Sequence, residues 1–168
     1  RAWVNPCRYA SSDGTYGKNH PKDYYNTHPE WLVKCGDITI LNPSLPEVRE
    51  QICKVVADIV KNYDVDGIIF DDYFHQSGYK DSYDDAQYNA YKDTASTVMS
   101  RADWRRAQNN LMVRMVKDTI KAVKPWVKFG IGPAGVAGKA NTSAPVYGVE
   151  PCPTPSSDWQ YNQIYADP

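Results

Sequence analysis

Two stretches of the chain place apolar residues three or four positions apart, which is the spacing of an amphipathic helix. The first stretch covers residues 48–63 and the second covers residues 104–123. The first pattern stops at residues 62–64, and the second ends at Lys124 because Pro125 follows it. We therefore expect two long helices that each bury one face.

The first helix is preceded by a start signal. Ser44-Leu45-Pro46-Glu47 fits a capping box, in which the Ser44 hydroxyl accepts a hydrogen bond from a free backbone N–H and Glu47 reaches back to the cap. Proline in the first turn suits such a start. The sequence therefore predicts that Ser44 caps this helix.

Three short apolar runs predict strands at residues 2–5, 65–70 and 127–131, and Pro6 ends the first of them. Because strands and helices alternate, we expect an α/β fold with βαβ units and a parallel sheet. A (β/α)8 barrel takes about 250 residues. The chain would supply roughly three of the eight units of such a barrel.

Polar segments separate these elements. Residues 10–37 are rich in Gly, Ser, Asp, Asn, Pro and Tyr and are predicted to form a long loop. Residues 76–102 form a polar excursion with a helical piece around residues 84–93, and the tail from residue 135 to 168 is expected to be loop-like. We find no internal repeat and expect residues 1–168 to form a single partial-barrel domain of catalytic type.

Composition narrows the classes of function. The chain has 168 residues, 19 Lys and Arg, and 20 Asp and Glu, for a net charge of −1, which argues against nucleic-acid binding through bulk positive charge. No apolar run approaches the ~20 residues that a membrane helix needs. The 13 Tyr and 5 Trp against 3 Phe suit half-wet surfaces such as sugar-binding clefts, although Tyr can equally replace Phe in a core.

The four cysteines show no spacing typical of a metal site, and no cofactor is expected. Four cysteines allow three complete disulfide pairings, among which the sequence cannot choose. We favour free structural thiols. The residues are Cys7, Cys35, Cys53 and Cys152.

Polar residues follow each predicted strand, at the end where functional groups gather in parallel α/β folds. Asn5 and Arg8 follow the first strand. Gly130 and Gly132 close the third strand, where the backbone can approach a ligand. The richest set follows the second strand and consists of Asp71, Asp72, Tyr73 and His75.

Asp71 and Asp72 are the leading catalytic candidates. Neighbours along a strand point to opposite faces, so Gly67, Ile69, Asp71 and Tyr73 share one face. Because the small Gly67 suits a crowded interior, we place Asp71 inward at the mouth of a barrel and expect Asp72 to act as a hydrogen-bonding brace. Two alternatives stay open: both aspartates cap the following turn, or the carboxylates bind Ca²⁺ or Mg²⁺.

Several other residues are candidates for substrate binding. Arg8 can donate to sugar hydroxyls or form a structural ion pair. His75 can shuttle protons or be an exposed loop residue. The pair Arg105-Arg106 is expected to form a solvated charged face beside a packed tryptophan. Stacking on a sugar and plain packing both remain open for Trp3, Tyr9, Tyr73, Phe74 and Trp159.

Seven blocks of the chain follow one another in a characteristic order. The first is Ala2-Trp3-Val4-Asn5-Pro6-Cys7-Arg8, and the others are residues 28–33, 41–49, 63–68, 70–74, 103–106 and 124–131. Taken in this order, the blocks resemble the glycosyl-hydrolase-like family 10, whose pattern AWxNPxR the first block fits. The order of the blocks, rather than any single one, makes the resemblance specific over nearly the whole chain.

The resemblance implies a TIM barrel related to glycoside hydrolases, in a family commonly exported in bacteria to the periplasm or beyond the cell. The matched blocks resemble the third to fifth barrel strands, and residues 158–162 resemble the lead-in to the sixth. The chain would then be the middle of a barrel, whose sheet edges need other segments of its parent or a second copy to cover them. Ile69, His75 and Cys7 differ from the residues that the family usually carries there.

We therefore favour a glycoside hydrolase that acts on poly- or oligosaccharides. Such hydrolysis uses two carboxyl groups, and Asp71 is the candidate for one of them, as nucleophile or base. The second group is open among Asp72, Glu150, Asp158 and a residue outside the chain. A non-catalytic carbohydrate-binding relative and a metal-dependent hydrolase remain alternatives. The expected substrate-binding residues are Trp3, Asn5, Arg8, Tyr73, His75 and Trp159.

Overall fold

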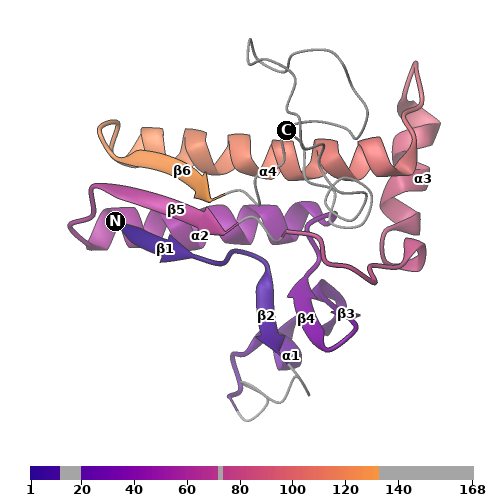
Figure 1. Cartoon of the computed structure of the whole chain (residues 1–168), viewed down its shortest axis with the longest axis horizontal. Helices are drawn as coiled ribbons and strands as arrows, with labels where there is room; N and C mark the ends of the chain where they lie inside the picture. The colour runs from indigo at the N-terminus through magenta and orange to yellow at the C-terminus, as the bar shows by residue number, and fades with distance from the viewer. Residues whose placement is uncertain (12–19, 72–73, 133–168) are drawn as a thin grey trace, which may run out of the picture.

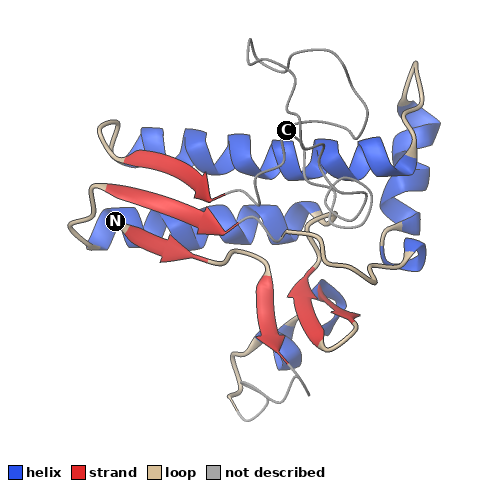
Figure 2. Cartoon of the chain, in the orientation of Figure 1, coloured by secondary structure: helices blue, strands red, loops and turns tan. Residues whose placement is uncertain are grey.

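The computed structural model describes residues 1–11, 20–71 and 74–132, which form two three-stranded sheets with helices around them (Figures 1 and 2). The parallel sheet contains β1 (Ala2–Val4), β5 (Gly67–Asp71) and β6 (Lys128–Gly132). The antiparallel sheet contains β2 (Arg8–Ser11), β3 (Leu32–Cys35) and β4 (Ile38–Leu41).

The parallel sheet has the order β1-β5-β6, so strands that follow one another as β/α units are also neighbours in space. Helix α2 (Pro46–Asn62) leads into β5, and helix α4 (Arg101–Val123) leads into β6. The two helices pack against each other on the same side of the sheet (Figure 1). The expected parallel β/α units are thus confirmed, and the described residues form an open sheet rather than a closed barrel.

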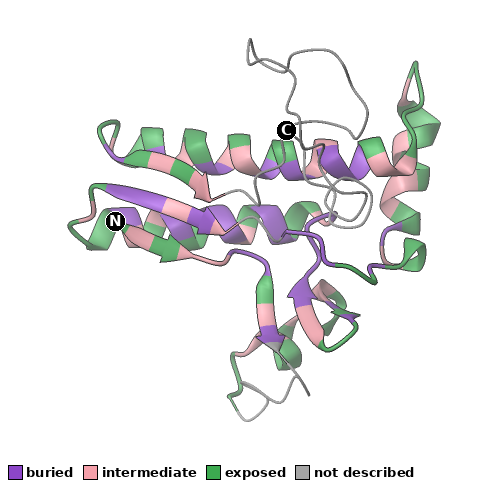
Figure 3. Ribbon diagram, in the orientation of Figure 1, coloured by how far each residue is buried: buried purple, intermediate pink, exposed green. Residues whose placement is uncertain are grey.

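The main core lies between this sheet and the two helices. Ile68 and Phe70 of β5 are 1% and 0% exposed, and the Phe70 ring meets Phe129 of β6 edge-on at 5.1 Å between centroids. Val56 of α2 and Val116 of α4 are fully buried and belong to the same core cluster as Ile68 and Phe70 (Figure 3). The apolar stripes of α2 and α4 therefore do what their 3.6-residue period predicts.

The antiparallel sheet corrects the prediction of a long loop over residues 10–37. It has the order β2-β4-β3 and lies in sequence between β1 and α2, together with α1 (Tyr24–Thr27) and the 3₁₀ helix η1 (Pro29–Trp31). Gly36 joins β3 to β4 with a φ of 61°, a conformation that favours glycine. Figure 1 shows this sheet projecting from the carboxyl end of β1.

The start of α2 differs from the predicted capping box. The helix begins at Pro46, and its N-cap is Leu45, which has no side-chain hydrogen bond to the helix. Ser44 instead lies buried with its hydroxyl near His75 and Asp84. Because the Ser44 hydroxyl contacts two polar groups of a distant segment, it does not cap the first turn of α2.

The excursion between β5 and α4 contains the 3₁₀ helix η2 (Asp81–Tyr83) and α3 (Asp85–Thr94), which confirms the helical piece predicted near residues 84–93. The expected solvated face at Arg105-Arg106 is wrong, since these side chains are only 2% and 6% exposed. Arg105 forms an ion pair with the buried Asp84, and a buried guanidinium needs such a partner.

The cysteines that the structure describes are buried free thiols, as predicted: Cys7, Cys35 and Cys53. Burial raises the pKa of the Cys7 thiol to about 12, so this group stays protonated at neutral pH. Cys152 and the predicted loop-like tail lie outside the described residues.

Candidate active site

The side of the parallel sheet that faces away from α2 and α4 is the candidate site. We call it the open face; it carries Trp3, Ile69, Asp71, Gly130 and Gly132. Strand register sets these neighbours, because Trp3 pairs with Ile69, Ile69 with Gly130, and Asp71 with Gly132. A pocket of about 310 Å³ lies between β5 and β6 toward their amino-terminal ends; its lining includes Gly67, Ile69 and Gly130 but not Trp3 or Asp71.

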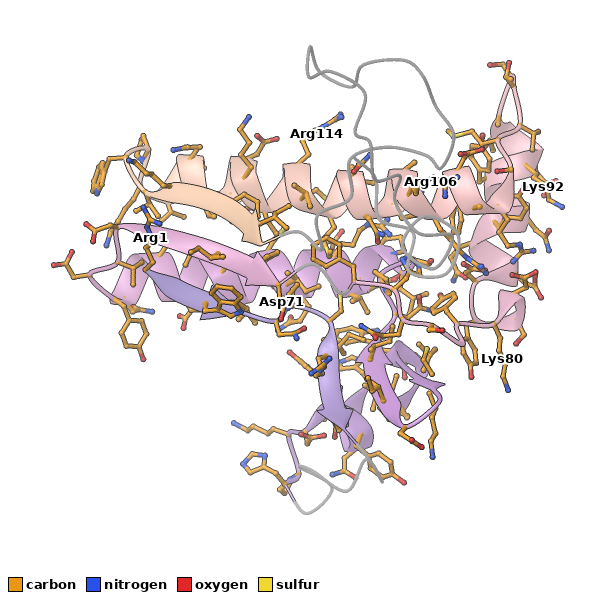
Figure 4. The ribbon with its side chains drawn as sticks, in the orientation of Figure 1. Arg1, Asp71, Lys80, Lys92, Arg106 and Arg114 are labelled. Atoms are coloured by element: carbon orange, nitrogen blue, oxygen red, sulfur yellow. The ribbon has the colours of Figure 1, made fainter. Side chains whose placement is uncertain are left out.

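Asp71 is the last residue of β5, at the carboxyl end of the middle strand. The alternate residues Ile68 and Phe70 are buried toward the helices, whereas Ile69 and Asp71 are half-buried on the open face. The predicted placement of Asp71 on the face opposite Phe70 is therefore confirmed, whereas the identity of this face as the interior of a barrel stays a prediction. Figure 4 shows Asp71 near the point where the chain leaves β1 for β2.

Trp3 gives the open face a large aromatic surface. The side chain is 66% exposed, and a Cβ atom added at Gly132 would lie 3.5 Å from its Cη2 atom. The indole of β1 therefore extends across β5 to the end of β6, beside the position of Asp71. Glycine at positions 130 and 132 leaves the open face of β6 without side chains there, since Ile131 packs against the core on the other face. An exposed aromatic face beside a carboxylate suits a sugar ring, which is apolar on its faces and polar at its edge.

Asn5 and Arg8 lie where β1 turns into β2. The Asn5 side-chain oxygen accepts a hydrogen bond from the Arg8 backbone N–H at 3.2 Å, which shapes this turn. The Arg8 side chain is exposed, and none of the ion pairs among the described residues involves its guanidinium. The structural ion pair considered from the sequence is therefore not seen among residues 1–11, 20–71 and 74–132.

His75 lies in the interior rather than at a surface. Its side chain is 0% exposed; Nδ1 lies 2.9 Å from Asn109 Oδ1, and Nε2 lies 3.4 Å from the Ser44 hydroxyl. Burial, helped by the positive charge of Arg105, lowers the pKa of His75 to about 3, against which the Asn109 hydrogen bond acts. The expectations of an exposed loop histidine and of a substrate contact conflict with this burial.

Two aromatic residues considered for stacking on a sugar, Tyr9 and Phe74, have contacts within the protein. The Tyr9 hydroxyl donates to Asp23, and burial together with that carboxylate raises the Tyr9 pKa to about 12. Phe74 is buried and meets Phe70 edge-on at 6.4 Å. Phe74 therefore belongs to the core, and Tyr9 is half-buried on β2 with its hydroxyl bonded to Asp23.

A family model described as glycosyl hydrolase-like 10 matches residues 2–168. The chain belongs to this family. The glycosyl hydrolase-like 10 assignment confirms the resemblance drawn from the seven ordered blocks, and it includes every residue of the open face.

Curated proteins give the same relationship. The chain is 36% identical over 143 residues to the protein named glycosyl hydrolase DigH of Escherichia coli (strain K12), a match that covers 80% of the chain and 32% of the relative. It is 38% identical over 138 residues to glycosyl hydrolase YngK of Bacillus subtilis (strain 168), covering 80% of the chain and 26% of the relative. The chain thus spans about a third or less of the length of these two relatives.

Several predicted residues of this glycosyl hydrolase-like 10 chain lie outside the described residues: Asp72, Tyr73, Glu150, Asp158 and Trp159. Within the described ranges, no three His, Cys, Asp or Glu side chains gather as a metal site. In those same ranges, no helix has the length and apolar character needed to cross a membrane.

Proposed function

We propose that this chain forms part of the active site of a glycoside hydrolase that cleaves O-glycosidic bonds in poly- or oligosaccharides. In this proposal β1, β5 and β6 are the third to fifth strands of a (β/α)8 barrel, and the open face is the barrel interior. The observation that carries the proposal is the position of Asp71, at the carboxyl end of the middle strand and beside the exposed indole of Trp3. Membership of the family supports the choice of a sugar substrate.

Each residue has a role that follows from its position. Asp71 acts as nucleophile or base at the anomeric carbon or its attacking water. Trp3 stacks on a sugar ring, and the exposed Arg8 donates hydrogen bonds to sugar hydroxyls. The second carboxyl group comes from Asp72, Glu150 or Asp158, or from outside the chain. Its distance from Asp71 would set the stereochemistry, at about 5–5.5 Å for retention and about 6.5–9.5 Å for inversion.

Release of reducing ends from a panel of oligosaccharides tests this proposal. The full-length protein is compared with its Asp71→Asn variant, with and without a chelator. Asp66→Asn is the matched control, because Asp66 is an exposed aspartate at the opposite end of the same strand. We expect turnover that falls roughly 100- to 10,000-fold in Asp71→Asn, as for loss of a catalytic acid or base, and that persists in Asp66→Asn and with chelator.

Other outcomes select the alternatives. Sugar binding without any release would favour a non-catalytic carbohydrate-binding protein. Turnover that disappears with chelator would favour a metal-dependent hydrolase. Where turnover occurs, the anomeric configuration of the first product separates retention from inversion.

The proposal extends to the location of the protein. A glycoside hydrolase of an exported family would work in the periplasm or outside the cell. Fractionation of cells that express the full-length protein tests this location, and recovery in the cytoplasm alone would contradict it.

A further inference from the structure

Six polar side chains form a cluster in the interior, where the segments before α2 and after β5 meet the amino-terminal part of α4. Each has at most 4% of its surface exposed. We call the group the buried polar cluster; its members are Asn42, Ser44, His75, Asp84, Arg105 and Asn109.

The buried polar cluster joins three separate parts of the chain. Ser44 precedes α2, and its hydroxyl lies 3.4 Å from His75 Nε2 and 3.3 Å from Asp84 Oδ2, both in the segment after β5. From α4, Arg105 donates to both Asp84 oxygens, at 2.6 Å and 2.7 Å. Asn109, also on α4, contacts His75. Every one of these contacts crosses from one element to another.

His75 is the residue that contacts both neighbouring parts through its ring. Asn109 Oδ1 can only accept a hydrogen bond, so His75 Nδ1 carries the proton and Nε2 is an acceptor. The Ser44 hydroxyl has one proton, which faces both this Nε2 atom at 3.4 Å and Asp84 Oδ2 at 3.3 Å. The ring also packs edge-on against Tyr79 at 4.7 Å, and the Tyr79 hydroxyl donates to Asn42 at 2.6 Å. A neutral imidazole thus links α4 to the segment before α2.

The cluster is close to Asp71 along the chain. Asp71 is the last β5 residue with a register partner, Gly132 on β6. His75 follows Asp71 by four residues and is fully buried. The sheet fixes the chain up to Asp71, and the buried polar cluster fixes it again at His75.

We propose that the buried polar cluster positions the Asp71 carboxylate, and that His75 is the positioning residue that anchors the chain beyond β5 to α4 and to the start of α2. This inference rests on the proposed catalytic role of Asp71. His75 itself touches no substrate, because its side chain has no exposed surface.

The test compares full-length variants in steady-state kinetics on a cleaved oligosaccharide and in hydrogen–deuterium exchange. His75→Leu removes both ring hydrogen bonds, His75→Gln retains one polar end, and Asn109→Ala removes the bond from the α4 side. Val116→Ala is the control, since Val116 is a fully buried α4 residue outside the cluster. We expect kcat to fall roughly 10- to 100-fold in His75→Leu with KM changed far less, partial recovery in His75→Gln, and no fall in the Val116→Ala molecules that remain folded.

Equal kcat values in His75→Leu and Val116→Ala would overturn the inference. If His75→Leu does not fold, the kcat of Asn109→Ala is compared with that of Val116→Ala instead, and equal values would overturn the inference. If the wild-type protein releases no sugar, the proposed function fails. Hydrogen–deuterium exchange then tests on its own whether the buried polar cluster holds the segment after β5 in place. Faster exchange confined to residues 67–71 and 74–84 would then support its hold on this segment, whereas a uniform change or no change would overturn it.

Discussion

The two faces of the parallel sheet contrast sharply although they share the same strands. Toward α2 and α4, Ile68 and Phe70 are at most 1% exposed. On the open face, Trp3 of β1 is 66% exposed, and Asp71, the residue after Phe70 on β5, is half-buried. Because successive strand residues alternate between faces, a single step along β5 separates a packing position from a candidate catalytic one.

This contrast explains why the strand tolerates an aspartate at its end. A carboxylate directed toward the helices would be buried among apolar side chains, at a high desolvation cost. Directed away from them, Asp71 keeps contact with solvent. A slip of one residue in the register of β5 would exchange the two faces, so the packing of Phe70 also fixes the placement of Asp71.

The largest expected effect on stability separates the two faces directly. Phe70→Ala should reduce the free energy of unfolding by about 3–5 kcal/mol, because it empties a fully buried site between Phe74 and Phe129. Ile69→Ala, on the open face of the same strand, should cost about 1 kcal/mol. Urea denaturation followed by tryptophan fluorescence measures both values.

An equal loss at the two positions would break the contrast. It would mean that further structure covers Ile69 in solution as completely as the helices cover Phe70. Repeating the pair in the 168-residue chain and in the full-length protein shows which part of the polypeptide provides that cover.

Much of the parallel layer could be predicted from the sequence. The stripes of α2 and α4 are long and regular, and their ends are marked by residues 62–64 and Pro125. Period-two alternation was sufficient to place Asp71 opposite Phe70. These features depend on local patterns, which a sequence displays directly.

The antiparallel sheet was missed because its polar residues resemble loop composition. A signal was present, since Val33, Ile38 and Ile40 flank Gly36-Asp37 at the alternating spacing of a hairpin. The pairing of β2 with β4 joins residues about thirty positions apart, for which no local pattern exists.

The buried polar cluster could not be predicted for a similar reason. His75 meets Asn109 over 34 positions and Ser44 over 31. Ser44 satisfies the local rule for a helix cap, and a distant carboxylate and imidazole override that rule. Among the described candidates for substrate contact, the tertiary structure places both His75 and Phe74 in the interior.

The pH dependence of stability gives the next largest effect and concerns the helix-covered side, where His75 meets α4. Because burial lowers the pKa of His75 to about 3, the unfolded chain binds a proton between about pH 6.5 and pH 3 that the folded chain does not. The contribution of His75 is therefore complete above about pH 6.5 and is lost as the pH falls through this window, by about 1.4 kcal/mol per pH unit.

Urea denaturation at about pH 7.5 and about pH 5 measures this effect, as the difference between the wild-type protein and His75→Gln. The wild-type protein should lose about 2 kcal/mol more than the variant over that interval. Identical pH profiles would show that His75 is solvated in solution.

The smallest effect concerns Trp3 on the open face. If its indole stacks on a sugar, Trp3→Ala should raise KM about tenfold, which corresponds to about 1.4 kcal/mol of binding free energy. The value of kcat should change less than KM, because stacking on the face of a sugar ring is made with substrate and transition state alike. Trp3→Tyr retains an aromatic face and should recover most of the affinity. A KM unchanged in Trp3→Ala would mean that this exposed aromatic surface is covered by protein, and that the open face meets sugar only near Asp71.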